Sequence, residues 1–445
     1  MSTSLGFIRK EASQKEVLRT VLNLAVPILL SNLLYTFQNV VSLLLVSPLG
    51  KEVIAGVGFA STLLWLIYAT TEVVYTGVNV LVAQVVGAGK RGGSILLAGF
   101  ILSIVISLPV TLWGEELLRL FLTSFSTPDR VIDVALEYLR PILLLLPLVF
   151  ITNAINAGFN GLGKTRVIFF ATLFVSILNV ALSLVLIYGL LGFPALGVEG
   201  AGWAVAISES LAAFFYLPFL LKEEQINPLK DVEIRLENLS KLVKVGFPAG
   251  LEEIVMTLSY NFFVGLVATC GTAALAAFHI GLRVESFSLA VGMAFSFVAT
   301  TVVGQNFGAV NWDGIKRGVR ATLLLAVSIM TFLGLSMGLF SRWLTEFFTG
   351  DREVVYWAVR YLWMIALSQP LIAIAFVLSG AIRGLGKTQL PLVVNTLSFW
   401  IVRVIPSLLL LSFYRTPYVP WGAMVLESVW RALTYLALWK RVSRL

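Results

Sequence analysis

The chain has 445 residues, of which 58% are hydrophobic and only 13% are charged, with a formal net charge of +8. Soluble domains usually carry about 25% charged residues, so this composition excludes an ordinary soluble globular protein and indicates one whose solvent is mostly lipid. A single cysteine, Cys270, and a single histidine, His279, exclude an internal disulfide and disfavour a metal centre built from these two ligand types. We therefore expect no metal and no cofactor.

Apolar runs of about 20 residues, the length that crosses a hydrocarbon core of about 30 Å, recur along the whole chain. They predict twelve transmembrane helices, at residues 18–46, 53–86, 93–113, 131–155, 166–189, 198–221, 240–269, 273–305, 316–340, 353–381, 389–413 and 419–439. On this topology 21 of the 32 lysines and arginines fall on one side of the membrane and 8 on the other. Because basic loops stay in the cytoplasm, we expect a multi-pass protein of the inner membrane with both termini cytoplasmic. The net positive charge then implies no nucleic acid partner.

An internal repeat divides the chain into two halves. Its anchors keep an offset of 221 to 223 residues over most of the sequence. The matching positions are Pro27 and Pro248, Gln84 and Gln305, Tyr138 and Tyr361, Pro147 and Pro370, Gly200 and Gly422, and the identical GLGKT segments at 161–165 and 384–388. We expect an all-α fold with an N-terminal six-helix bundle at 1–221, a cytosolic linker loop at 222–239 and a C-terminal six-helix bundle at 240–445. With six spans in each, the halves insert the same way up, which predicts a pseudo-two-fold axis along the membrane normal.

At these anchors the sequence resembles the multidrug and toxic compound extrusion (MATE) transporters of the multidrug/oligosaccharidyl-lipid/polysaccharide exporter superfamily. The resemblance runs from about Leu18 to Leu438. Besides the first-helix proline, it rests on VAQVVGAGK at 82–90, NAGFNGLGKT at 156–165, GVEGAGWA at 197–204, VVGQNFGA at 302–309 and SGAIRGLGKT at 379–388. It implies a secondary transporter rather than an enzyme, expected to act as a monomer. Such a protein would export amphipathic or cationic organic compounds in exchange for H⁺ or Na⁺, by alternating access between two bundles.

Charged side chains within the predicted spans are candidates for ion coupling, because a charge at that depth costs about 2.5–3.5 kcal/mol on insertion scales. The candidates are Glu252, Glu253, Glu285, Arg283 and His279, all in the second half. An arginine beside several glutamates keeps some of them ionised and leaves one to exchange a proton or bind a cation. Histidine titrates near neutral pH. A salt-bridge cluster that only stabilises the second bundle is the competing interpretation.

Polar and aromatic residues within the spans are candidates for the wall of a substrate cavity. They are Tyr35, Gln38, Asn39, Tyr68, Glu72, Tyr75, Asn153, Asn156, Asn179, Met256, Tyr260 and Asn261. The alternative is that they form hydrogen bonds between helices. Pro27 and Pro248 lie inside spans and predict helix kinks. These kinks are either static or part of a change in the cavity.

The sequence departs from the family at the positions where many members carry acids. Serine stands at positions 42 and 183, where prokaryotic members often have aspartate. Met256 and Ile372 stand where other members carry a glutamate in span seven and an aspartate in span ten. The coupling residues therefore do not carry over from the resemblance, and the coupling ion stays open between H⁺ and Na⁺, with uncoupled operation as a further alternative.

Two other functions are alternatives for a chain with this organisation. A flippase for lipid-linked oligosaccharides from the same superfamily would share the paired bundles, but an anionic pyrophosphate head group would require several cavity arginines. A membrane enzyme is a third hypothesis, and the sequence contains no HExxH metal-binding pair to support it.

Overall fold

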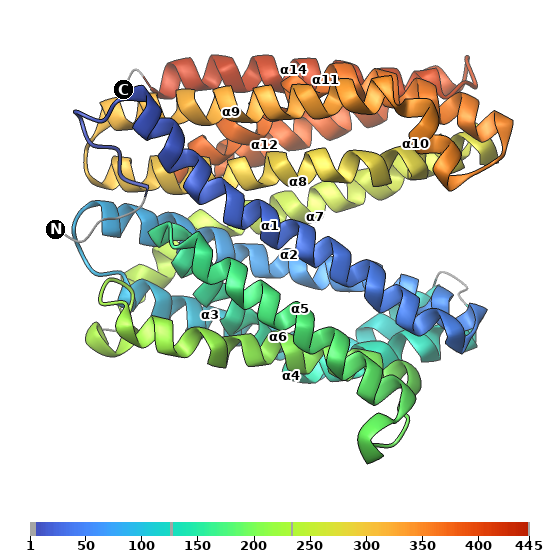
Figure 1. Ribbon diagram of the computed structural model, residues 1–445, viewed down its shortest axis with the longest axis horizontal. Helices are drawn as coiled ribbons and strands as arrows, with labels where there is room; N and C mark the ends of the chain where they lie inside the picture. Colours follow the sequence, from blue (N-terminus) through green and yellow to red (C-terminus); the bar gives the residue numbers. More distant parts are fainter. Residues whose placement is uncertain (1–5, 125–127, 233–234, 444–445) are drawn as a thin grey trace. The chain divides into compact units, whose positions relative to one another are not determined.

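The structure, a computed structural model, describes residues 6–124, 128–232 and 235–443. This part of the chain is helical and contains no strand. The helices are α1 (Gln14–Val46), α2 (Lys51–Gly87), α3 (Gly93–Ser124), α4 (Asp129–Leu162), α5 (Thr165–Tyr188), α6 (Gly197–Lys222), α7 (Leu236–Ala268), α8 (Thr272–Gly308), α9 (Trp312–Leu339), α10 (Ser341–Phe348), α11 (Arg352–Gly384), α12 (Gln389–Leu397), a π-helical turn η4 (Ser398–Val404), α13 (Ile405–Leu411) and α14 (Tyr418–Val442) (Figure 1).

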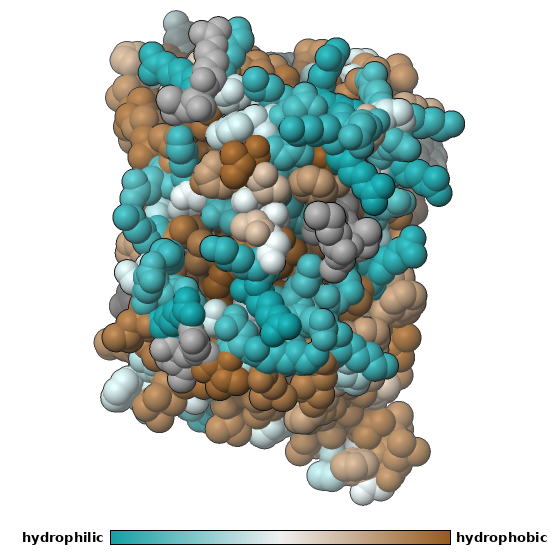
Figure 2. Space-filling view, turned by 90° about the vertical axis from the view of Figure 1, so that its left-hand side faces the viewer, coloured by the Kyte–Doolittle hydropathy of each residue, from teal (hydrophilic) through white to brown (hydrophobic). Residues whose placement is uncertain are grey.

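Within the described residues, eleven helical segments are long and apolar enough to cross a membrane. They comprise α1 to α9, α11, and the continuous segment Gln389–Leu411 formed by α12, η4 and α13. The expected twelfth span corresponds to α14, whose 25 residues suffice for a crossing, but buried Glu427 and Arg431 interrupt its apolar sequence. Large apolar side chains such as Trp65, Phe214 and Leu367 are at least 60% exposed, as expected of a surface that faces lipid. Hydrophilic side chains gather on the end of the molecule shown in Figure 2.

The chain folds into two compact units, which we call the N-unit (Leu30–Gly250) and the C-unit (Met1–Leu29 with Leu251–Leu445). The chain passes from one unit to the other within three residues of Pro27, inside α1, and of Pro248, inside α7. In each of these two helices, therefore, the first half belongs to one unit and the second half belongs to the other. The expected bundles were divided at the linker 222–239. The units differ from them by an exchange of two half-helices, because the first half of α1 belongs to the C-unit and the first half of α7 belongs to the N-unit.

Small residues bring the helices of each unit into close contact. In the N-unit, a Cβ on Gly202 of α6 would lie 2.2 Å from the carbonyl oxygen of Tyr138 in α4, and one on Gly246 of α7 would lie 1.8 Å from that of Val73 in α2. In the C-unit, Gly380 of α11 is equally close to Ser296 of α8. Lipid tails are as apolar as the helices, so such backbone contact supplies much of the packing energy. Glycine is required at these positions for this reason.

We predict that Gly246→Ala lowers the thermal unfolding temperature of the purified protein, because α2 and α7 must move apart to admit the methyl group, and overpacking costs about 1–3 kcal/mol. Gly265→Ala, on the same helix, is the matched control, since nothing lies within 4 Å of the added carbon. It should be neutral or slightly stabilising, because alanine is a better helix former than glycine. Equal unfolding temperatures for the two variants would contradict the close approach.

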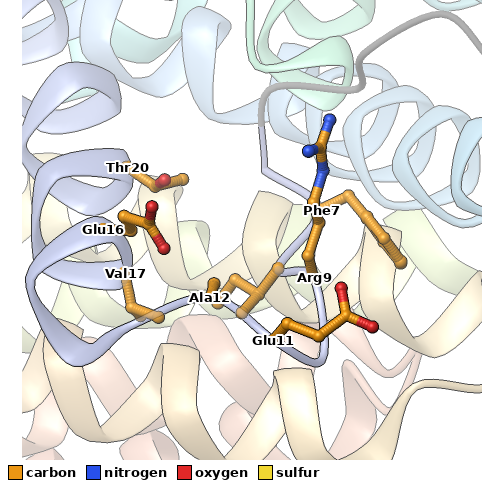
Figure 3. A pocket seen from close by; sticks show the side chains of 8 residues that line it. Phe7, Arg9, Glu11, Ala12, Glu16, Val17 and Thr20 are labelled. Carbon is orange, nitrogen blue, oxygen red and sulfur yellow. The ribbon is translucent and has the colours of Figure 1, made fainter.

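A non-helical segment before α1, residues 6–12, is bound to the C-unit, and we call it the N-terminal strap. Side-chain amides at the end of α8 pair with its backbone: Asn306 accepts from Ile8 N–H at 3.2 Å and donates to Gly6 O at 3.1 Å. Asn311 donates to Ile8 O at 2.7 Å, and Ile8 itself is buried. A shallow cavity of about 370 Å³ lies between the strap and the first turns of α1, with Phe7, Arg9, Glu11 and Glu16 around it (Figure 3).

A second strap, residues 223–231, precedes α7 and is fastened to the N-unit in a corresponding way. Gly92 N–H donates to Gln225 O at 2.7 Å, Ser94 N–H donates to the Asp231 carboxylate at 3.0 Å, and Ile226 is fully buried. Lys230 binds Glu224 at 2.6 Å, and this hydrogen bond lowers the pKa of the Glu224 carboxyl. Each unit is therefore closed at one end by the segment that leads into its exchanged half-helix.

Replacing Asn306 by alanine should release the N-terminal strap, since two backbone groups of the strap then lose their buried partner, at a cost of about 1–3 kcal/mol. Amide hydrogen exchange should rise in peptides that cover residues 6–12. Peptides that cover 223–231 report the second strap in the same sample and should not change. Exchange that stays slow in residues 6–12 would mean that Asn306 does not hold the strap.

Candidate transport sites

The N-unit contains a cavity of about 260 Å³ that five of its helices line. Its wall consists of Tyr35, Gln38, Tyr68, Thr71, Val149, Thr152, Asn153, Asn156, Ala171, Thr172, Val175, Glu209, Ala212 and Tyr216. Five of the twelve residues expected from sequence to line a cavity are in this set: Tyr35, Gln38, Tyr68, Asn153 and Asn156. The cavity thus combines tyrosine rings, amides and hydroxyls with one acid.

That acid, Glu209 of α6, is half-buried, and Tyr68 O–H donates to its Oε2 at 2.7 Å. Glu209 is not among the site residues expected from the sequence. A spacing signal was present, because Glu209, Ala212 and Tyr216 follow a 3-4 pattern on one face of α6, and all three line the cavity. Since no lysine or arginine lines this cavity, Glu209 gives it a negative potential when ionised.

At positions 42 and 183, where the resemblance described above implied aspartates, this chain carries serines. Ser42 O–H donates to Asn179 Oδ1 at 3.2 Å, and Asn179 Nδ2 donates to Ser208 Oγ at 3.4 Å. Ser183 is also buried. Asn179 therefore connects α1, α5 and α6 instead of lining the cavity. The N-unit thus has a neutral network at Ser42, Asn179 and Ser208, and its cavity carboxylate, Glu209, lies on α6.

The remaining predicted cavity residues lie elsewhere. In α2, Glu72 accepts a hydrogen bond from Thr76, and Tyr75 accepts one from Asn160 Nδ2 at 3.0 Å. Asn39 is exposed. Met256, Tyr260 and Asn261 belong to the part of α7 in the C-unit, where Tyr260 and Asn261 are exposed.

In the C-unit, Glu252 is buried and bound to residues that the sequence did not associate with it. Its Oε1 accepts from Arg383 Nη2 at 2.7 Å and from Asn395 Nδ2 at 2.5 Å. Asn395 in turn accepts from Tyr435 O–H at 3.1 Å. Arg383 lies in the last turn of α11, so this ion pair connects the end of α11 to α7.

Glu285 of α8 occupies a separate buried site. Tyr361 O–H donates to its Oε2 at 2.9 Å, and Gln369 Nε2 donates to its Oε1 at 3.4 Å. Ser288 O–H donates to Gln369 at 2.5 Å and orients that amide. The hydrogen-bond partners of this carboxyl are all neutral, so it can take up or lose a proton without breaking an ion pair.

A third buried acid, Glu427 of α14, is held by two arginines. Arg403 Nη2 lies 2.6 Å from one carboxylate oxygen and Arg431 Nε lies 3.1 Å from the other, which Ser398 also binds. The ring of Phe399 lies beneath both guanidinium groups, at 4.5 Å from Arg403 and 5.3 Å from Arg431. Ser398, Phe399 and Arg403 belong to the π-helical turn η4, an irregularity frequent at functional sites.

When Glu285 and Glu427 are both ionised, their negative charges balance the positive charges of Arg403 and Arg431. Glu427 contacts both arginines directly, and the same arginines exert an electrostatic attraction on Glu285. Glu427 and Arg431, four residues apart on α14, are therefore part of a larger group of charges. In contrast, Arg283 and His279 are exposed, and neither forms an ion pair among the described residues. Glu253 is half-buried beside Glu252.

Glu427→Gln should destabilise the C-unit strongly, by about 3–5 kcal/mol, because two buried arginines lose their shared counter-ion. Glu285→Gln should cost less, since no direct ion pair is lost and the glutamine oxygen can still accept from either Tyr361 or Gln369. Thermal unfolding of the two variants in the same detergent measures this difference. Equal destabilisation would show that the arginines depend on Glu285 as much as on Glu427.

Long apolar helices, a polar cavity within one unit and buried charges within the other define a multi-pass membrane transport protein. The sequence profile described as MatE matches residues 27–185 and 248–409, which is more than half of the chain. The chain therefore belongs to the MatE family, the multidrug and toxic compound extrusion transporters.

Known proteins agree with this assignment. The chain is 28% identical over 421 residues to the probable multidrug resistance protein YoeA of Bacillus subtilis, covering 92% of this chain and 89% of that one. It is 25% identical over 426 residues to the probable multidrug resistance protein NorM of Thermotoga maritima, covering 94% and 91%. The crystal structure of the Vibrio cholerae MATE transporter VcmN in the bent form superposes with a TM-score of 0.87 at 20% identity, covering 97% and 98%. That likeness establishes the fold.

Proposed function

We propose that this protein exports amphipathic or cationic organic compounds across the inner membrane in exchange for a cation, by alternating access. The observation that carries the proposal is the N-unit cavity, where the Glu209 carboxylate lies among tyrosines and amides with no basic residue in the lining. The similarity of the chain to proteins named for multidrug resistance supports efflux of small molecules.

The chemistry of the cavity favours a cation with a flat apolar body. Tyrosine rings attract cations through their π faces, and a carboxylate in surroundings of low dielectric attracts them more strongly than it does in water. The amides of Gln38, Asn153 and Asn156 can form hydrogen bonds with substrates of different shapes. An anionic pyrophosphate head group would be repelled by Glu209, so a lipid-linked oligosaccharide flippase is not favoured.

Competition between the cationic substrate and the coupling ion for the Glu209 carboxylate links export to ion movement. Protonation removes the negative charge and releases a bound cation, whereas loss of the proton restores the attraction. We infer that H⁺ is the coupling ion, because the carboxylates of Glu209 and Glu285 accept hydrogen bonds from donor groups, whereas a Na⁺ site needs several oxygen acceptors around the ion. Glu285, with neutral hydrogen-bond partners, is the corresponding candidate in the C-unit.

Orientation and movement complete the proposal. The excess of lysine and arginine on one side predicts that both termini lie in the cytoplasm, and we expect the protein to act as a monomer. Pro27 and Pro248 lie where the chain passes between units, and proline removes a backbone hydrogen bond. We infer that α1 and α7 bend there when the cavity changes access.

The test is transport by the protein in liposomes, measured with a fluorescent cationic dye under an imposed pH gradient and, separately, a Na⁺ gradient. We expect dye movement driven by the pH gradient and at least a tenfold loss in Glu209→Gln, because the amide can neither ionise nor exchange a proton. Glu199→Gln is the matched control, since Glu199 is an exposed glutamate in the first turn of the same helix, and its rate should stay within twofold.

The other outcomes are equally informative. Movement driven only by the Na⁺ gradient would show that the coupling ion is Na⁺ and not H⁺. Gradient-driven movement retained by Glu209→Gln and lost by Glu285→Gln would transfer coupling to the C-unit. No dye movement in either gradient would contradict the proposed function.

A further inference from the structure

The outer face of the N-unit carries an apolar groove between α5 and α6, which run side by side in opposite directions (Figure 1). This α5–α6 groove has a volume of about 430 Å³ and is lined by Arg166, Val167, Phe170, Leu173, Phe174, Ile177, Phe215 and Phe219. Phe170 is 55% exposed and Ile177 is 63% exposed. The groove is therefore open to whatever surrounds the helices.

Aromatic rings give the groove a fixed wall. Phe174 of α5 stacks on Phe215 of α6 with ring centroids 5.3 Å apart, and Phe215 packs on Phe219 at 5.6 Å. Their neighbours in sequence, Val175 and Tyr216, line the N-unit cavity on the other side of the same helices. One layer of side chains thus separates the groove from the cavity.

One end of the groove is basic. Arg166 is the second residue of α5 and is exposed, and Lys222 is the last residue of α6 and is also exposed. Because the helices are antiparallel, these two residues lie at the same end. The nearby acid Glu223 is already bound to Lys164. Among the described residues neither Arg166 nor Lys222 forms an ion pair, so this end is positively charged on the side that we expect to face the cytoplasm.

The length of the groove matches one leaflet of a bilayer. From Arg166 to Ile177 the helix rises about 16 Å at about 1.5 Å per residue, which is roughly half of a hydrocarbon core of about 30 Å. A molecule with an anionic head at Arg166 and an apolar chain reaching Ile177 would meet complementary chemistry along this whole length.

We propose that the α5–α6 groove is a binding site for an anionic phospholipid of the cytoplasmic leaflet. One acyl chain lies along the phenylalanine wall, and the phosphate binds Arg166, with Lys222 adding attraction. A cationic amphiphile of the kind proposed as substrate would bury the same chain but would be repelled at the basic end. The site is therefore separate from the transport cavity and does not depend on the proposed function.

Native mass spectrometry of the full-length protein tests the proposal. Protein in detergent is mixed with equal amounts of phosphatidylglycerol and phosphatidylcholine, and the lipids that remain bound are counted. We expect phosphatidylglycerol to be retained preferentially, and Arg166→Gln to weaken its retention about fivefold, as a basic residue at the surface contributes about 1 kcal/mol to attraction of anionic lipid. Arg320→Gln is the control, because Arg320 is an exposed arginine near the start of α9 in the C-unit and does not line the groove.

A second measurement locates the lipid. Phosphatidylglycerol with a photoreactive acyl chain should label peptides that contain residues 166–177 or 215–219, and Phe170→Ala should reduce that labelling while Arg320→Gln does not. Equal retention of both lipids, equal loss in the two arginine variants, or labelling only outside these peptides would each overturn the proposal. So would labelling of the groove by a photoreactive cationic dye that phosphatidylglycerol fails to displace.

Discussion

A buried charge in a membrane protein must be paired or able to become neutral, and the C-unit depends on how this constraint is met. Glu427 is surrounded by Arg403, Arg431 and Ser398, so its charge is compensated within the protein. The same arginines act on Glu285, whose hydrogen-bond partners are neutral. One carboxylate is thereby committed to holding α14 against η4, and the other remains available to titrate. The packing of this unit and the proton exchange that we propose for Glu285 thus depend on the same two arginines.

The two units share an ancestral repeat but have diverged in their polar interiors. The N-unit holds a cavity with one acid and a neutral network around Asn179, while the C-unit contains three buried acids bound to arginines, amides or hydroxyls. We infer that this difference gives the units different tasks in the proposed cycle. In our proposal the N-unit binds the substrate and exchanges a proton for it, and the C-unit supplies a second titratable group in a stable frame.

Much of the fold was predictable because helix length, basic loops and the repeat are local or periodic properties of the sequence. Partnerships across helices were not. Glu252 was expected near Arg283, but it binds Arg383, which on sequence grounds belonged to a loop. Which face of a buried helix meets which neighbour depends on packing, and helices that are apolar all round show little periodicity to reveal it. The exchange at Pro27 and Pro248 was hidden for the same reason, since a continuous helix gives no sign that its two halves belong to different units.

The exchange of half-helices determines what happens when the chain is cut or shortened. A cut within residues 222–239 would not separate the units, because each fragment would still carry a half-helix that completes the other unit. Conversely, a gene that encodes only the first half supplies an N-unit without its α7 segment, Leu236–Gly250, and leaves residues 6–29 without the C-unit on which they pack. We therefore expect the two halves of the chain to depend on each other for folding.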